Sequence, residues 1–216
     1  MNSLQKIFIS LGANQGDRLQ YLQKAIDALY VNIGNTVAIS PIYETKSWGF
    51  DSADFLNCCV CLTTDLQPEL LLKELQQLET SLGRAEKTTT AYEARCIDID
   101  VLFYADVVMK TTTLSIPHIA LQDRNFVLAP LADIASGIMH PVLKKTVSVL
   151  LDECTDTNEV VKITETLNNP FDAHVFSKFN FIAIEGNIGS GKTSLVHKIT
   201  SDFNAKCILE RFADNA

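Results

Sequence analysis

The chain has 216 residues, of which 47% are hydrophobic and 20% are charged, a composition typical of a soluble globular protein with a sizeable core. Its formal net charge of −8 argues against a general binder of nucleic acid or of anionic membranes, so we expect small-molecule partners. The first residues lead straight into a short apolar run without a signal peptide, and no apolar run approaches the length of a membrane span. These features predict a cytoplasmic protein.

The first half of the chain alternates short apolar runs with amphipathic periods. Strands are predicted over residues 6–12, 37–43 and 55–63. A helix is predicted after Asp17, which can cap its start, because apolar residues recur at helical spacing between Leu19 and Leu29. A second helix over residues 70–83 has Pro68 in its first turn and Gly83 at its end.

Later segments carry less regular patterns. Residues 84–94 form a polar, threonine-rich connection without hydrophobic period, which we expect to be mobile and able to close over a ligand. Terminal helices are predicted over residues 127–134 and 147–151. The six cysteines have neither zinc-site nor disulfide-framework spacing, so we expect small buried side chains in a reducing compartment.

The most informative stretch is the predicted strand over residues 95–103. Because side chains alternate along a strand, Asp98 and Asp100 share one face, and the other face holds the apolar residues Ile97, Ile99, Val101 and Phe103. Two carboxylates roughly 6–7 Å apart at Cα can reach a shared pair of metal ions, and Mg²⁺ is commonly held by carboxylates together with substrate phosphates. A half-exposed strand that shows acids to water is the alternative.

Other polar and aromatic residues also allow two interpretations. Asn57, at the head of an apolar strand, is either a turn residue or an amide presented to a heterocycle. Taken singly, Phe55 and Phe126 would more often be core residues, and His118 a structural histidine.

In combination, these residues resemble one known family, the 6-hydroxymethyl-7,8-dihydropterin pyrophosphokinases, from residue 5 to about residue 155. Six motifs occur in family order and at nearly family spacing: Leu11-Gly12-Ala13-Asn14, Phe55-Leu56-Asn57, Leu82-Gly83-Arg84, Arg95-x-x-Asp98-x-Asp100, Ile116-Pro117-His118 and Arg124-x-Phe126. The resemblance implies an α+β fold, a ferredoxin-like three-layer αβα domain with a mainly antiparallel sheet. It also implies an enzyme of folate biosynthesis that transfers pyrophosphate from ATP, the co-substrate, to the hydroxymethyl group of the pterin and leaves AMP.

The resemblance also implies roles for individual residues. Asp98 and Asp100 would hold two Mg²⁺ ions and, with Arg84 and Arg95, carry the catalysis. The ATP site would comprise Gln76, Glu79, Arg84, Arg95, Val101, His118 and Arg124, and the pterin pocket would comprise Thr45, Phe55, Asn57 and Phe126. The loop before the acid strand lacks the tryptophan and the additional basic residues that many family members carry.

A different pattern follows the matched region. We expect a domain over residues 1–157, a polar linker over 158–177 with one short strand near Val160, and a second domain over 178–216. A predicted strand over 179–185 leads into a loop with phosphate-loop spacing, whose defining residues are Gly186, Gly189, Gly191, Lys192 and Thr193. This region resembles the start of deoxynucleoside kinases, with Glu210 as the base, and we interpret it as an incomplete strand-loop-helix-strand fragment of such a kinase.

Three functions therefore compete. The main hypothesis is a pterin pyrophosphokinase, and the alternatives are a deoxynucleoside kinase in the tail and a non-catalytic nucleotide-binding regulator. The intact Arg95, Asp98 and Asp100 favour the first, because binding alone does not need two metal carboxylates. Under this hypothesis, a chain that ends near residue 160 would keep the pyrophosphoryl transfer.

Overall fold

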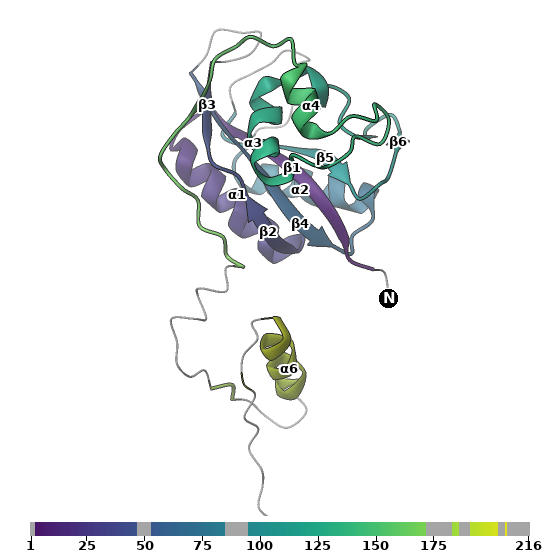
Figure 1. The fold of residues 1–216 in the computed structure, drawn as a ribbon. Helices are drawn as coiled ribbons and strands as arrows, with labels where there is room; N and C mark the ends of the chain where they lie inside the picture. The colour runs from purple at the N-terminus through teal and green to yellow at the C-terminus, as the bar shows by residue number, and fades with distance from the viewer. Residues whose placement is uncertain are drawn as a thin grey trace, which may run out of the picture. The chain divides into compact units, whose positions relative to one another are not determined.

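An antiparallel sheet forms the centre of residues 1–171, the first of two units into which the chain divides (Figure 1). The computed structural model describes residues 3–46, 53–84, 95–171, 183–185, 191–202 and 206. In chain order, the elements of the first unit are β1 (Gln5–Ala13), α1 (Arg18–Asn32), β2 (Asn35–Ile39), β3 (Tyr43–Thr45), β4 (Phe55–Thr64), α2 (Pro68–Ser81), β5 (Asp98–Tyr104), β6 (Met109–Lys110), β7 (Ser115–Ile116), the 3₁₀ helix η1 (Leu121–Asp123), α3 (Asn125–Ala135), α4 (Val147–Asp152) and β8 (Val160–Lys162).

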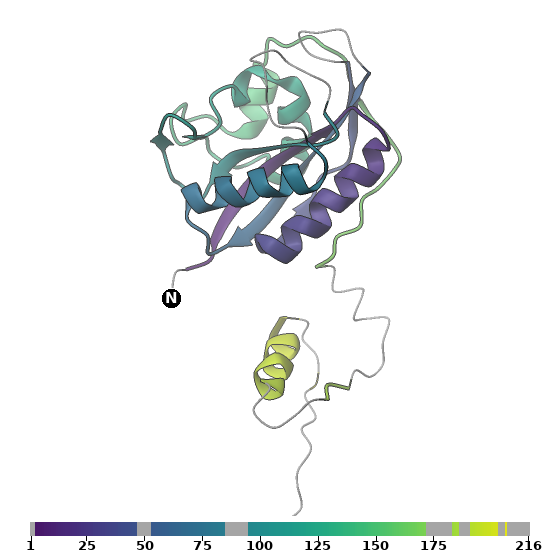
Figure 2. The ribbon, with the colours of Figure 1, turned by 180° about the vertical axis from the view of Figure 1, so that it is seen from behind.

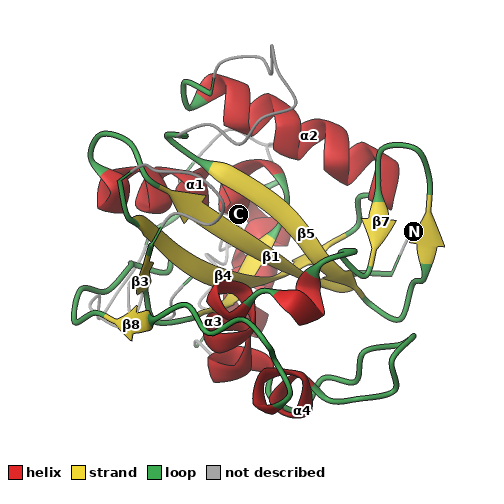
Figure 3. Ribbon diagram, turned by 90° about the horizontal axis from the view of Figure 1, so that it is seen from above, coloured by secondary structure: helices red, strands yellow, loops and turns green. Residues whose placement is uncertain are grey.

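The sheet has the strand order β5-β1-β4-β3-β8, and β2 pairs with the other end of β4. Helices cover both faces: α1 and α2 lie side by side on one, and α3 and α4 lie on the other (Figures 2 and 3). Each face has its own apolar cluster, with alternate residues of β1 and β4 contributing to each. The predicted α+β class with a mainly antiparallel sheet is therefore confirmed.

The two long helices of the first unit form where the sequence predicts them, although α2 runs from Pro68 to Ser81 rather than over residues 70–83. Asp17 caps α1 by accepting a hydrogen bond from the backbone N–H of Gln20 at 3.0 Å. Pro68 occupies the first turn of α2, and Gly83 follows its end at φ +97°, a conformation that favours glycine. None of the helices in the described part of the chain is long and apolar enough to cross a membrane.

The strand predicted over residues 37–43 is wrong in its continuity, because the structure divides this stretch between β2 and β3. The break falls at Ser40 and Pro41, where the proline has no N–H to offer a neighbouring strand. The Ser40 hydroxyl instead accepts a hydrogen bond from the backbone N–H of Cys59 at 2.9 Å, and the Ser40 N–H donates to the Cys59 carbonyl at 2.9 Å. β3 is thereby a separate short strand opposite the start of β4.

The acid strand also differs from strict alternation. Phe8 pairs with Phe103 but Ile9 pairs with Val101, so Leu102 is an extra residue in β5. This β-bulge turns Phe103 onto the face opposite Ile97, Ile99 and Val101, where its ring contacts Phe8 edge-on at 6.3 Å between centroids. The prediction that Phe103 shares the face of the other apolar residues is therefore wrong.

Four cysteines on β4 and before β5 behave as small buried side chains. Cys58, Cys59, Cys61 and Cys96 are buried free thiols, and Cys154 is half-buried. On β4 they divide between the faces, since Cys58 packs against the α1 and α2 layer while Cys59 and Cys61 pack against the α3 and α4 layer. Cys207 lies outside the described residues.

The linker expected over residues 158–177 differs from the structure in its first part. Residues up to Phe171 belong to the first unit, and β8 extends the sheet by pairing with β3. Ile163 and Leu167, which follow β8, pack against the core beneath α1 and α2. The remainder of the expected linker, residues 172–177, lies outside the described residues.

The second unit, residues 172–216, is described only in part. It contains α6 (Lys192–Asp202), the helix expected after the phosphate loop. Residues 183–185 of the predicted strand are not in a strand, and residues 179–182 lie outside the described residues, as do Gly186, Gly189 and Glu210.

Candidate active site

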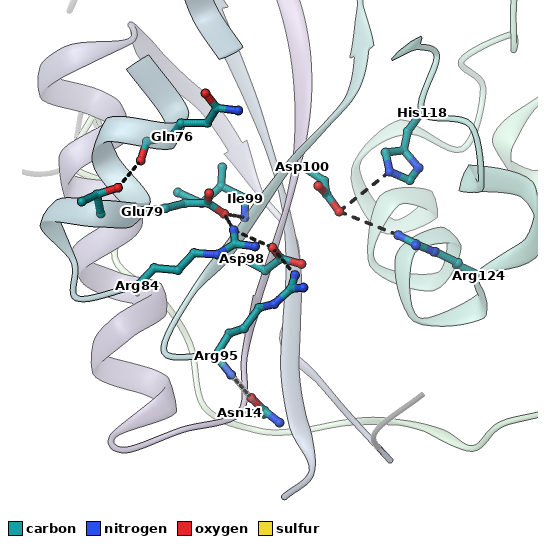
Figure 4. Close-up of polar contacts among 11 residues, drawn as sticks. Asn14, Gln76, Glu79, Arg84, Arg95, Asp98, Ile99, Asp100, His118 and Arg124 are labelled. Carbon is teal, nitrogen blue, oxygen red and sulfur yellow. Dashed lines mark hydrogen bonds and ion pairs between the residues drawn. The ribbon is translucent and has the colours of Figure 1, made fainter. Parts of the chain in front are cut away.

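The two acids of β5 lie on the face of the sheet that carries α3. Across the β1–β5 ladder, Asp98 pairs with Gly12 and Asp100 pairs with Ser10. Three arginines and a histidine converge on these carboxylates from three other parts of the chain (Figure 4): Arg84 after α2, Arg95 before β5, and His118 and Arg124 on the segment between β7 and α3. The sequence prediction that these residues lie together is supported by this geometry.

Asp98 binds two guanidinium groups. Its Oδ1 lies 2.8 Å from Arg95 Nη1 and 2.8 Å from Arg84 Nη1. Both arginine side chains are largely buried, so little water screens the pairs. Arg84 and Arg95 are thereby fixed beside the carboxylate, with planar groups suited to bidentate contacts with phosphate.

Glu79 on α2 holds both Arg84 and the backbone of β5. It is buried on α2, and its Oε1 accepts a hydrogen bond from the backbone N–H of Ile99, the residue between the two acids, at 2.8 Å. The same oxygen forms an ion pair with Arg84. Burial raises the pKa of Glu79 to about 7, the Arg84 charge opposes the rise, and the Asp98 charge adds to it. Glu79 therefore connects α2, β5 and Arg84.

Asn14 is a site residue for which the sequence analysis predicted no role. Its side chain is buried at the end of β1, where Oδ1 accepts a hydrogen bond from the Arg95 backbone N–H at 2.6 Å. The Asn14 N–H in turn donates to the Arg95 carbonyl at 3.0 Å, and Nδ2 donates to the Ala53 carbonyl at 3.3 Å. The available signal was a polar residue directly after a buried strand, within a motif that matched the family.

Asp100 lies farther from its neighbours Arg124 and His118 than Asp98 lies from its two arginines. Its Oδ2 lies 3.7 Å from Arg124 Nη1 and 3.9 Å from His118 Nε2, distances too long for direct hydrogen bonds. Desolvation and the Asp98 charge raise the pKa of Asp100, while His118 and Arg124 oppose the rise. Asp100 therefore lies near Arg124 and His118 without a direct hydrogen bond to either side chain.

His118 is oriented by its own loop. Its backbone N–H donates to the Leu102 carbonyl at 3.0 Å, and its Nδ1 accepts a hydrogen bond from the Ala120 N–H at 3.2 Å. Because Nδ1 is an acceptor, the proton of the neutral imidazole is on Nε2, which faces Asp100. Burial lowers the pKa of His118, the Asp100 charge raises it, and the Arg124 charge lowers it. His118 thus presents a donor to the acid site.

The residues predicted for the pterin pocket lie beside the same face. Asn57 on β4 and Thr45 on β3 are both buried, and Asn57 Nδ2 donates to Thr45 Oγ1 at 2.9 Å. A Cβ at Gly12 would lie 3.1 Å from Asn57 Oδ1 and 3.7 Å from the Phe55 ring. Phe126, in the first turn of α3, is half-buried, and the Arg124 guanidinium lies 5.8 Å from its ring centroid.

Two predicted ATP residues lie apart from the carboxylates. Val101 is buried in the core on the α1 and α2 side, so any ATP contact there rests on its backbone. Gln76 is exposed one turn before Glu79 on α2, and in Figure 4 no dashed line joins its side chain to the acids. The predicted closing loop falls on residues 85–94, outside the described residues.

The predicted phosphate loop of the second unit is described at its end alone. Gly191 has φ +80°, α6 starts at Lys192, and Thr193 is exposed in its first turn. The Leu195 N–H donates to the Gly191 carbonyl at 3.0 Å, which forms the first helical turn. These residues are therefore at a helix N-terminus, where phosphate loops end.

Comparison with known proteins gives these features a family context. The family model for 7,8-dihydro-6-hydroxymethylpterin-pyrophosphokinase (HPPK) matches residues 8–136. The chain is 37% identical over 152 residues to a 2-amino-4-hydroxy-6-hydroxymethyldihydropteridine pyrophosphokinase of Aquifex aeolicus, covering 69% of this chain and 92% of that protein. It is 38% identical over 138 residues to a protein of the same name from Porphyromonas gingivalis, covering 62% and 93%.

Solved structures support the fold. A crystal structure of wild-type HPPK-DHPS from Plasmodium falciparum aligns with a TM-score of 0.60 at 17% identity, over 71% of this chain and 45% of that one. The chain thus spans less than half the length of that solved protein. With the family match over residues 8–136 and relatives covered over almost their full length, the chain belongs to the 7,8-dihydro-6-hydroxymethylpterin-pyrophosphokinase family.

Proposed function

We propose that the first unit transfers the two terminal phosphates of ATP, as a pyrophosphoryl group, to the hydroxymethyl group of 6-hydroxymethyl-7,8-dihydropterin. The products are the pterin diphosphate and AMP, in folate biosynthesis. Family membership supports the reaction and the use of ATP as co-substrate. The observation that carries the proposal is the pair Asp98 and Asp100 set among Arg84, Arg95, His118 and Arg124.

Charge in this cluster fits a polyphosphate. A triphosphate brings several negative charges, and the arginines would form charge-assisted hydrogen bonds with its oxygens. Arg124 and His118 would bind on the Asp100 side, where their nitrogens are not in direct hydrogen bonds to that carboxylate. Arg84 and Arg95 would bind on the Asp98 side. Charge that develops on the bridging oxygen as the P–O bond breaks would thus meet fixed cations.

The same carboxylates fit Mg²⁺. Asp98 and Asp100 are hard oxygen ligands on one strand face. Desolvation and then the Asp98 charge raise the pKa of Asp100, and a cation between the two acids would offset that charge. Among the described residues, no group of three or more His, Cys, Asp or Glu side chains could hold a metal by itself. This donor set suits two ions held by the aspartates together with substrate phosphates. When bound, Mg²⁺ neutralises phosphate charge and favours ionisation of the attacking hydroxyl.

On the pterin side, Thr45, Asn57, Phe55 and Phe126 would bind the flat heterocycle. The Asn57 amide offers hydrogen bonds to a ring edge, and its bond to Thr45 fixes the amide plane. Gly12 supports this role, since a Cβ there would lie 3.1 Å from Asn57 Oδ1, which is tighter than most Cβ contacts. The two aromatic side chains would stack on the faces of the ligand.

The test is to incubate the full chain with ATP, Mg²⁺ and 6-hydroxymethyl-7,8-dihydropterin and to separate the nucleotide products. We expect AMP in proportion to the pterin consumed, and no AMP without pterin. ADP as the nucleotide product would instead indicate single phosphoryl transfer, and pterin-independent AMP would indicate a different acceptor.

We further propose that the second unit carries the phosphate loop of a deoxynucleoside kinase over residues 186–193. The start of α6 at Lys192, directly after Gly191 at positive φ, supports this proposal. Its test compares ATP binding to the full chain and to Lys192→Ala, with AMP formation measured alongside. We expect the variant to lose one ATP-binding equivalent while AMP formation stays unchanged, and equal ATP binding by the two chains would contradict the phosphate loop.

A further inference from the structure

The C-terminal strap, defined here as residues 156–171, follows α4 and lies outside the residues that match the family model. β8 pairs antiparallel with β3 and is the last strand on that side of the sheet. The Ile163 N–H donates to the Ile42 carbonyl at 3.0 Å. Farther along, Asn168 and Gln23 of α1 exchange two hydrogen bonds, of 2.8 and 3.1 Å. The strap is therefore attached to both the sheet and α1.

One contact of the strap joins two elements of the pterin side. Lys162 on β8 lies opposite Tyr43 on β3, and its Nζ is 3.2 Å from Asp133 Oδ2 on α3. The Tyr43 hydroxyl donates to the same Asp133 oxygen at 2.7 Å. Burial and this hydrogen bond raise the pKa of Tyr43 to about 12, so it remains a donor. β3, which carries Thr45, is thereby tied to α3, which carries Phe126.

A second contact lies at the first residue of α3. Asp156 Oδ2 accepts a hydrogen bond from the backbone N–H of Asn125 at 3.1 Å. Asn125 stands between Arg124 and Phe126, so the carboxylate holds the backbone that presents a phosphate-side cation and a pterin-side ring. A carboxylate is also favourable at a helix N-terminus, because unsatisfied N–H groups point toward it.

We propose that the C-terminal strap is a positioning element of the pterin site, in which β8 holds β3, and so Thr45, in the conformation that binds the pterin. It does so through two contacts, the ladder of β8 with β3 and the Lys162–Asp133 pair. The inference rests on the proposed function, since it assigns Thr45 to pterin binding. β3 is three residues long and has β4 and β8 as its two neighbours in the sheet. Without β8, one side of β3 loses its ladder, and its bound-like conformation becomes a smaller fraction of the ensemble. The functional end of the domain then lies after β8 rather than near residue 160.

The ladder offers a matched pair of substitutions. In an antiparallel pair, hydrogen-bonded and non-hydrogen-bonded positions alternate. Because Ile163 donates to Ile42, Val161 opposite Glu44 is also a hydrogen-bonded position, whereas the Val160 N–H points away from β3. Val161→Pro removes a donor to β3, and Val160→Pro places the same residue one position earlier at a site that an edge strand tolerates. The Val161 side chain is exposed, so little packing is lost.

The experiment measures AMP formation by the full chain, with pterin and ATP varied separately, and thermal unfolding of each variant. We expect Val161→Pro to raise the KM for pterin about tenfold, as when a binding-competent state falls to about a tenth of the population. The KM for ATP should stay within about twofold, and Val160→Pro should resemble the wild type. Lys162→Met keeps the ladder but cuts the link to Asp133, and should raise the pterin KM about threefold.

The outcomes separate the inference from the proposed function. If the wild-type chain forms no pterin-dependent AMP, the proposed function fails. If the wild type is active but Val161→Pro and Val160→Pro give the same pterin KM, the strap has no positioning role. A purely structural role predicts a lower unfolding temperature for Val161→Pro with an unchanged ratio of the two KM values. If Val161→Pro does not fold, an unchanged pterin KM in Lys162→Met overturns the proposal.

Discussion

Replacing Glu79 by glutamine should change how the stability of the first unit depends on pH. Burial raises the pKa of Glu79 from 4.5 to about 7, with Arg84 opposing the rise and Asp98 adding to it. The folded state therefore favours the protonated acid, so this stabilisation is complete below about pH 4.5 and is lost as pH rises through 7. The difference in pKa corresponds to about 3 kcal/mol, at about 1.4 kcal/mol per pKa unit.

Glu79→Gln keeps the side-chain volume and an acceptor for the Ile99 N–H but cannot ionise. We expect the free energy of unfolding of the variant, relative to the wild type, to rise by about 3 kcal/mol between about pH 4.5 and about pH 8. Urea unfolding followed by circular dichroism at several pH values measures this difference.

Glu69→Gln is the matched control, because Glu69 is exposed on the same helix. Its relative free energy of unfolding should vary by less than about 0.5 kcal/mol over the same range. If the Glu79→Gln difference were equally flat, the Arg84 ion pair would be keeping Glu79 ionised throughout, and the reasoning from burial would be refuted.

Three further predictions test the site. Asp98→Asn and Asp100→Asn should each lower kcat for AMP formation by at least about a hundredfold with the fold intact by circular dichroism, because both acids face the ligand side; near-normal turnover would remove their metal role. Asn57→Ala should weaken pterin binding by about 1–3 kcal/mol and leave ATP binding unchanged in calorimetry, whereas equal losses would indicate a structural role. Asn14→Ala should lower the free energy of unfolding by about 1–3 kcal/mol, since the buried Arg95 N–H loses its acceptor, and an unaltered thermal unfolding curve would contradict this.

Elements whose signal is local could be predicted from the sequence. The helical spacing from Leu19 to Leu29, the cap at Asp17 and the stop at Gly83 each depend on residues within a few positions, and α1 and α2 follow them closely. β4 likewise reads as a continuous apolar run, because both of its faces are covered by helices.

Features that depend on a distant partner could not be predicted. Pro41 was a local sign of the break between β2 and β3, but the hydrogen bond between Ser40 and Cys59 at that break joins residues nineteen positions apart. The β-bulge that turns Phe103 over is a property of the β1–β5 ladder rather than of β5 alone. The short strand near Val160 was anticipated, but its attachment to β3 joins residues more than a hundred positions apart.

The candidate site shows the same division. The motifs supplied the acids and their cations, because residue type and spacing carry that information. They did not supply Asn14 as the residue that fixes Arg95, nor the hydrogen bond from Ile99 to Glu79, since both are tertiary contacts between separate elements. For Val101 the opposite holds: the family motif predicts a contact with ATP, but the side chain is buried in the core.

The buried cysteines of β4 can report local opening on each face of the sheet. Cys58 and Cys59 are neighbours in sequence but face opposite helical layers. Burial raises the pKa of Cys58 to about 12, and burial together with the Cys58 charge raises the pKa of Cys59 well above its usual value. Because alkylation requires the thiolate, each thiol reacts when its own layer separates. Peptide mapping after timed alkylation would therefore give two rates. The rate at Cys58 measures separation of the α1 and α2 layer, and the rate at Cys59 measures separation of the α3 and α4 layer.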